Sequence, residues 1–266
     1  MTFSLFYYII SKNDNEKGIY FNMKEALYTI PVNDAFDNAT ESPLCECPIC
    51  SMYNSIQSDA INFTLGPSYM EDDIRMVTDK SGFCKDHLLL LYKHQNRLGL
   101  GLMLHTHMQH TVKNAEKLAK SPVKAPSFFK KDSQSNKLID FIENINNSCY
   151  ICNRINTTFD RYIATIFHLY KTDSSFAEKI KKSNGFCNEH FVCLYKNAST
   201  YLSGRDYEEF ISLITSSYID NMKRVTDDVE WFTDKFDYRN TDAPWKNSKD
   251  ALQRAVLKTT CGKIDA

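Results

Sequence analysis

A set of cysteine and histidine motifs occurs twice in this chain of 266 residues, and the duplication constrains its fold more than any other feature. The motif Cys47-Pro-Ile-Cys50 recurs as Cys149-Tyr-Ile-Cys152, and Gly82-Phe-Cys84-Lys-Asp-His87 recurs as Gly185-Phe-Cys187-Asn-Glu-His190. Cys50 and Cys84 are 84 − 50 = 34 positions apart, and Cys152 and Cys187 are 187 − 152 = 35 apart. A repeat in both residue type and spacing indicates a duplicated structural unit.

Each copy contains three cysteines and one histidine, which is the donor set of a closed tetrahedral zinc site. Two residues between paired cysteines allow a tight turn to direct both sulfurs at one ion, and the glycine before each later motif supplies a positive φ where the turn needs it. We therefore predict two zinc ions per chain, with each site built within one copy. The first set is Cys47, Cys50, Cys84 and His87, and the second is Cys149, Cys152, Cys187 and His190.

Other assignments of these residues remain open. Pairing across the copies, with Cys47 and Cys50 joined to Cys187 and His190, is geometrically conceivable in an intertwined pair of repeats. We favour sites within each copy because each of those sets is complete. Buried structural cysteines without metal are a further alternative, and an iron–sulfur cluster is less typical of three cysteines and a histidine in two separated pairs.

The repeat also distinguishes the remaining cysteines. Cys45 corresponds to Asn147 in the second copy, so we do not expect it to be a ligand. Cys193 corresponds to Leu90, which indicates a core position, and Cys261 stands alone near the C-terminus.

The fold is predicted to be all-α. Eight Gly and seven Pro are few for a turn-rich β-sandwich, and apolar residues recur at helical spacing. Helices are expected over 49–63 and 151–170, shorter ones over 70–80 and 175–182, a long helix after each motif histidine, and the longest over 207–236. The predicted architecture is two tandem helical repeats, each clamped by a zinc knuckle of three cysteines and one histidine, plus a long C-terminal helix.

The same patterns divide the chain into five segments. Residues 1–44 are expected to be an N-terminal extension and extended lead-in, and 45–118 the first zinc-helical repeat. Residues 119–136 form a basic linker, 137–203 the second repeat, and 204–266 the C-terminal helices that pack on the repeats.

Charge and hydropathy bear on location and partners. The 32 Lys+Arg and 33 Asp+Glu give a formal charge of −1, which removes the bulk electrostatic argument for a nucleic-acid or anionic-membrane binder. No apolar stretch approaches the roughly 18 residues that span a bilayer, and no signal peptide is recognised. Nine cysteines at metal-ligand spacing fit a reducing compartment, so we expect a cytoplasmic protein without a membrane partner.

One further metal site is considered. His107 and His110 are three residues apart on an expected helix, and an acidic side chain among residues 71–73 could complete a site for a metal ion or an enzymatic role. Exposed or core histidines are the simpler interpretation. No Ser/His/Asp triad order, phosphate-binding glycine loop or dinucleotide motif occurs.

Three functional hypotheses follow. The leading one is a non-enzymatic, zinc-stabilised binding or regulatory module with a protein partner, because four protein ligands leave no open metal position. The second is a thiol redox switch or chaperone-like sensor that releases zinc on oxidation, with Cys45 as the resolving thiol. The third is nucleic-acid binding through the lysines and aromatic residues of the segment 117–137.

The sequence also resembles an uncharacterised family of bacterial proteins, a domain of unknown function found mainly in Gram-positive anaerobes. The matching stretches are residues 28–36, 47–50, 65–75, 82–87 and 96–107. The resemblance covers most of the chain from Met23 and implies no activity. Residues before Met23 lie outside the pattern, so an alternative start of translation at Met23 is a further hypothesis.

Overall fold

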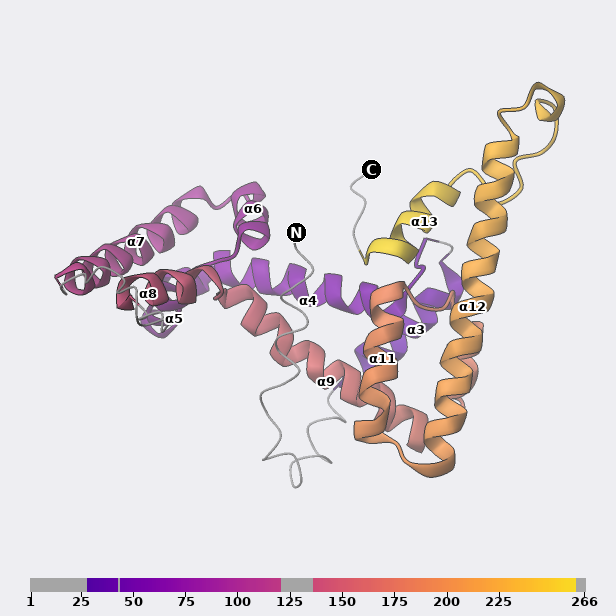
Figure 1. Ribbon diagram of the computed structural model, residues 1–266, viewed down its shortest axis with the longest axis horizontal. Coiled ribbons are helices and arrows are strands. Elements are labelled where there is room, and N and C mark those ends of the chain that lie inside the picture. Colours follow the sequence, from indigo (N-terminus) through magenta and orange to yellow (C-terminus); the bar gives the residue numbers. More distant parts are fainter. Residues whose placement is uncertain (1–27, 43, 121–135, 262–266) are drawn as a thin grey trace, which may run out of the picture. The chain divides into compact units, whose positions relative to one another are not determined.

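A computed structural model describes residues 28–42, 44–120 and 136–261 (Figure 1). These residues form α-helices, short 3-10 turns and connecting loops, with no β-strand among them, so the predicted all-α class is confirmed. The helices are α3 (Thr29–Glu41), α4 (Pro48–Leu65), α5 (Asp72–Ser81), α6 (Lys85–Lys93), α7 (Arg97–Ala119), α8 (Lys137–Asn146), α9 (Tyr150–Thr172), α10 (Phe176–Lys182), α11 (Asn188–Tyr201), α12 (Gly204–Asp234) and α13 (Ala251–Thr260).

The chain divides into two compact units. Among the described residues, the first unit comprises those up to Met52 and those from Asp160 onward, and the second comprises those from Tyr53 to Phe159. Both boundaries therefore fall inside the long helices α4 and α9, not in a linker. This division differs from the predicted segments 45–118 and 137–203, because each unit contains parts of both sequence repeats.

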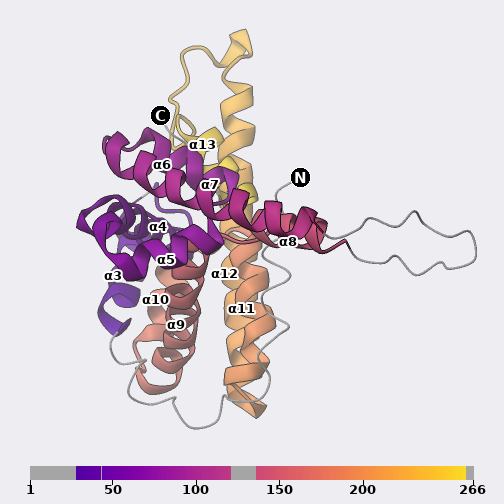
Figure 2. The same cartoon turned by 90° about the vertical axis from the view of Figure 1, so that its left-hand side faces the viewer.

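In the first unit, the core is rich in aromatic side chains. The Phe36 ring from α3 lies with its centroid 4.9 Å from that of Phe176 and 6.4 Å from that of Phe186. The Phe167 ring contacts Phe210 at 5.0 Å between centroids. Helices α11 and α12 lie side by side, next to each other in Figure 1 and overlapping in Figure 2. The helix predicted over 207–236 corresponds to α12, the longest helix of those described.

In the second unit, α5 lies along α7. The Thr106 hydroxyl of α7 donates to Asp79 Oδ1 at 2.5 Å, and Arg75 Nη2 lies 3.2 Å from the same hydroxyl. His107 Nδ1 lies 2.8 Å from the carbonyl oxygen of Asp79 near the end of α5. These polar contacts fix the end of α5, from which the chain turns at Gly82 toward Cys84.

Two local expectations from the sequence were wrong. Part of the lead-in 28–44 is helical, since α3 buries Val32, Ala35, Phe36 and Ala39 at helical spacing against the first unit. The long helix expected after His87 is interrupted between α6 and α7, because Asn96 accepts a hydrogen bond from Gly99 N at 2.8 Å and starts a new helix. The expectation of an unbroken helix holds only after His190, in α11.

None of the helices in the described parts of the chain combines the length and apolar character that a membrane crossing requires.

Candidate metal centres

The eight cysteines and histidines of the duplicated motifs gather into two groups of four. The Cys47 site consists of Cys47, Cys50, Cys187 and His190, and the Cys84 site consists of Cys84, His87, Cys149 and Cys152. Within each group the ligand atoms all lie within 4.8 Å of one another. The grouping of ligands within each sequence copy was therefore wrong: each paired-cysteine motif meets the Gly-Phe-Cys motif of the other copy.

The course of the two long helices accounts for this exchange. Cys47 immediately precedes α4, which begins in the first unit and continues into the second, where α5 and α6 follow. Cys149 immediately precedes α9, which begins in the second unit and continues into the first, where α10 and α11 follow. The later motif of each copy therefore lies in a different unit from the paired cysteines of its own copy, and it meets the paired cysteines of the other copy.

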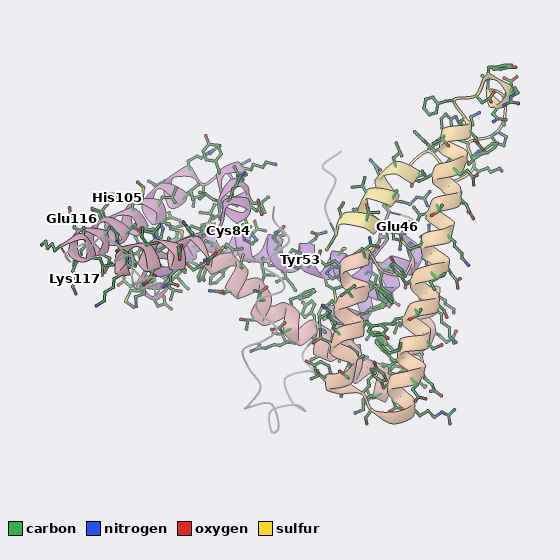
Figure 3. All side chains as sticks on the ribbon, in the orientation of Figure 1. Glu46, Tyr53, Cys84, His105, Glu116 and Lys117 are labelled. Atoms are coloured by element: carbon green, nitrogen blue, oxygen red, sulfur yellow. The ribbon has the colours of Figure 1, made fainter. Side chains whose placement is uncertain are left out.

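Each ligand pair lies at the start of a helix. Cys84 and Cys187 are the N-cap residues of α6 and α11, and their histidines follow in the first helical turn. Backbone N–H groups at a helix start have no partner within the helix, and the helix dipole favours negative charge there. Two helix starts meet at each site, so both sites are suited to thiolate sulfur. Figure 3 labels Cys84 at the start of α6.

The glycine before each later motif has the predicted backbone conformation, with φ of 57° at Gly82 and 76° at Gly185. A Cβ added at Gly185 would lie 2.9 Å from the backbone oxygen of Ser217. A Cβ at Gly82 would meet the ring of His107 at 2.7 Å. Both the turn and the close packing therefore require glycine.

The separations at the Cys84 site match a tetrahedral metal centre. His87 Nδ1 lies 3.2 Å from the sulfur of Cys84, 3.2 Å from that of Cys152 and 3.5 Å from that of Cys149. The sulfurs of Cys84 and Cys152 are 3.8 Å apart. Bond lengths of about 2.3 Å to sulfur and 2.05 Å to nitrogen at tetrahedral angles give about 3.6 Å between sulfur and nitrogen and about 3.8 Å between two sulfurs.

The Cys47 site has nearly the same geometry. His190 Nδ1 lies 3.5 Å from the sulfur of Cys47, 3.3 Å from that of Cys50 and 3.2 Å from that of Cys187. The sulfurs of Cys50 and Cys187 are 3.6 Å apart. The two sites are thus repeats of one arrangement, related by exchange of the sequence copies.

Crowding of these groups shifts the thiol pKa values in opposite directions, since hydrogen bonds with Cys149 and Cys84 raise the pKa of Cys152. Hydrogen bonds with Cys149 and Cys152 lower the pKa of the Cys84 thiol. Burial acts to lower the pKa of His87, but hydrogen bonds with the Cys149 and Cys84 sulfurs outweigh it and raise this pKa to about 9. The donors of the cluster thus share protons between them, and a divalent cation coordinated by the sulfurs would replace those protons.

Outer contacts orient the ligands of the Cys84 site. Gln57 Nε2 lies 3.2 Å from His87 Nε2, the ring nitrogen that faces away from the cluster. Tyr150 N donates to Gly82 O at 3.0 Å, and Ser148 Oγ donates to Ser81 O at 2.6 Å. These two bonds join the residues on either side of Cys149 to the segment that precedes Cys84.

A buried charge network surrounds the Cys47 site. Glu46, which is labelled in Figure 3, precedes Cys47 and is 2% exposed. It pairs with Arg224 of α12 at 2.6 Å. Lys258 of α13, 1% exposed, lies 3.2 Å from the same carboxylate. Its Nζ also donates to Glu46 O at 2.7 Å and to Asn184 O. Lys258 therefore joins α13 to both segments that lead into this site.

Two of the other cysteines lie outside the four-residue groups, as the repeat predicted. Burial raises the pKa of Cys45 to about 11, and its sulfur lies 3.9 Å from the carbonyl oxygen of Cys47. Burial likewise raises the pKa of Cys193 to about 11.

Sequence reasoning missed the position of Cys261. Its sulfur lies 3.6 Å from the sulfur of Cys50 and 3.6 Å from His190 Nδ1, at the Cys47 site. Hydrogen bonds with Cys187 and Cys50 lower the pKa of the Cys261 thiol to about 3. Cys261 falls outside both repeats and has no counterpart, so no spacing signal could have found it.

The histidines of α7 do not form a metal-binding group with acidic residues in the described parts of the chain. His107 Nδ1 contacts Asp79 O, and His110 Nε2 lies 3.2 Å from Asn114 Nδ2. Most of the basic segment predicted to contact anions, residues 121–135, lies outside the described residues.

Comparison of the sequence with known protein families matches residues 23–266 to a family of unknown function (DUF6062). Comparisons with curated proteins and with solved structures gave no match. The family match covers both repeats and all eight clustered cysteines and histidines, and it agrees with the resemblance seen in the sequence. The chain therefore belongs to this family of unknown function.

Proposed function

We propose that this protein is a non-enzymatic binding or regulatory module held together by two structural zinc ions per chain. The observation that carries the proposal is that each group of four donors is complete and has tetrahedral separations. Three sulfurs and one imidazole nitrogen would fill the coordination of zinc, leaving no position for water or substrate. The metal would supply cross-links between helices.

The donor chemistry supports zinc over other common ions. Calcium and magnesium prefer oxygen ligands, whereas thiolate and imidazole suit zinc. The Cys84 site would tie the start of α6 to the start of α9, and the Cys47 site would tie the start of α4 to the start of α11. Binding to such a site contributes directly to folding, because the unfolded chain has no preformed site.

The cellular setting and partner are part of this proposal. Clustered free thiols are stable in a reducing environment, which supports a cytoplasmic location. We expect the partner to be a protein. A redox switch that uses Cys45 is less well supported, because its raised pKa keeps the thiol protonated and poorly nucleophilic.

Metal analysis tests the proposal directly. Protein purified without added chelator is expected to contain two zinc ions per chain, and its melting temperature is expected to fall sharply after chelation. A preparation without zinc, or one containing iron with visible absorption, would contradict the proposal. A third bound equivalent would direct attention to His107 and His110.

A further inference from the structure

The two candidate sites differ by one sulfur. At the Cys47 site, Cys261 lies at the same distance from Cys50 as the ligand Cys187 does, 3.6 Å between sulfurs. Its sulfur is also 3.6 Å from His190 Nδ1 and 3.7 Å from Nε2. At the Cys84 site, the sulfur contacts seen among the described residues run between its own four members.

The position of Cys261 is built into the fold. It follows α13, whose residue Lys258 is buried and bonded to the backbone of both segments that lead into the Cys47 site. Cys261 itself has φ of 50° and ψ of 41°, a left-handed conformation that is uncommon for residues other than glycine. The surrounding contacts therefore hold this side chain at the site despite a backbone cost.

We propose that Cys261 is an alternate zinc ligand at the Cys47 site, so that zinc is held there by Cys47, Cys50, Cys187 and either His190 or Cys261. The proposal rests on the proposed function, because it assumes that the site binds zinc. Structural zinc is commonly bound either by three cysteines and one histidine or by four cysteines, so both ligand sets are chemically suitable.

The exchange is balanced without an oxidant. The Cys261 thiolate sulfur would form a bond to zinc, while the bond from zinc to His190 would break and leave a neutral imidazole. The site then carries one more negative charge. Lys258, Arg224 and Arg254 lie around Glu46 beside this site and stabilise that charge.

The Cys84 site provides a matched control, because no sulfur equivalent to Cys261 is seen there among the described residues. We expect His190→Ala protein to keep two zinc ions per chain, because Cys261 completes the set. The corresponding change at the other site, His87→Ala, is expected to leave one zinc. The double variant His190→Ala/Cys261→Ser is also expected to hold one zinc. Elemental analysis of each protein, after circular dichroism confirms its helicity, gives the stoichiometry.

The outcomes separate the two proposals. Wild-type protein without zinc would contradict the proposed function itself. If the wild type holds two zinc ions, then loss of one from His190→Ala, or retention of both by the double variant, would overturn the role of Cys261.

A second measurement does not depend on folding of the His190 variant. In competition with a chelator, Cys261→Ser is expected to weaken one of the two zinc equivalents by about 10-fold, the scale on which supporting groups affect metal affinity. The other equivalent should be unaffected. Cys193→Ser serves as the control, because that thiol lies outside both sites. Two unchanged affinities in the Cys261→Ser protein would overturn the proposal.

Discussion

At the scale of single residues, backbone conformation is as important to the metal sites as ligand identity. Gly82 and Gly185 both have positive φ and both precede the later ligand pair of a site. Replacing either glycine would strain the turn that directs a cysteine at the cluster. The ligand geometry thus depends on residues that donate nothing to the metal.

Substitution of Gly185 tests this requirement. Gly185→Ala is expected to destabilise the fold by about 1–3 kcal/mol, because φ is 76° and the new Cβ would press on Ser217 O. Gly101, in α7, has open space around it, so Gly101→Ala is expected to stabilise by about 0.5–1 kcal/mol. Urea unfolding of both variants measures the difference. Equal changes in the free energy of unfolding of the two variants would show that the turn does not require glycine at position 185.

Alkylation kinetics test the protonation of a cysteine outside the sites. Burial raises the pKa of Cys193 from 9.0 to about 11, so its reactive thiolate is expected to be about 100-fold scarcer at pH 8 than in a free thiol. Reactivity should rise as pH increases through about 11. Mass spectrometry of zinc-loaded protein treated with iodoacetamide at several pH values gives the profile. An alkylation profile of Cys193 with its midpoint near pH 9 would contradict the raised pKa.

At the scale of elements, α13 is attached to the Cys47 site mainly through charged side chains. Arg254 and Lys258 are 2% and 1% exposed, and both lie near the carboxylate of Glu46. Arg254 also pairs with Asp228 of α12 at 2.8 Å. Buried charges are tolerated only when they are paired, so these contacts fix where α13 lies.

Loss of Lys258 should therefore release α13. Lys258→Met is expected to destabilise by about 3 kcal/mol, since it leaves two buried backbone carbonyls and part of the Glu46 carboxylate without their partner. Lys249→Met is the control, because Lys249 is exposed. Denaturant unfolding measures both variants, and hydrogen exchange of α13 reports its detachment. Wild-type stability of Lys258→Met would refute this anchoring role.

At the scale of the whole molecule, each metal site belongs to one compact unit. All four residues of the Cys84 site lie within 53–159, and all four of the Cys47 site lie within 1–52 and 160–266. Damage to one site should therefore affect its own unit first.

Removing one ligand of the Cys84 site tests this separation. Cys84→Ser is expected to bind one zinc per chain and to lose several kcal/mol of stability. Hydrogen exchange should accelerate in α5 and α6, while amides around the Cys47 site stay protected. Cys193→Ser should keep two zinc ions. A well-folded Cys84→Ser protein with both metals, or uniform loss of protection across both units, would contradict the expectation.

The sequence alone determined the helical class and the eight clustered cysteines and histidines. Both were readable because helical periodicity and motif spacing are local properties of the chain. The glycines with positive φ were readable for the same reason. The helix α3 was also encoded locally, in the spacing of Val32, Ala35, Phe36 and Ala39, although we expected an extended segment there.

Only the tertiary structure decided which motifs share a site. Within-copy and cross-copy pairing use the same residues at the same spacing, so the sequence left both open. The helices α4 and α9 each run from one compact unit into the other, and the packing within each unit brings together motifs from different copies. Cys261 reaches the Cys47 site because α13 is anchored there. One of the anchoring hydrogen bonds joins Lys258 to Glu46, which are 212 positions apart in the sequence. Contacts at such separations depend on how the whole chain packs.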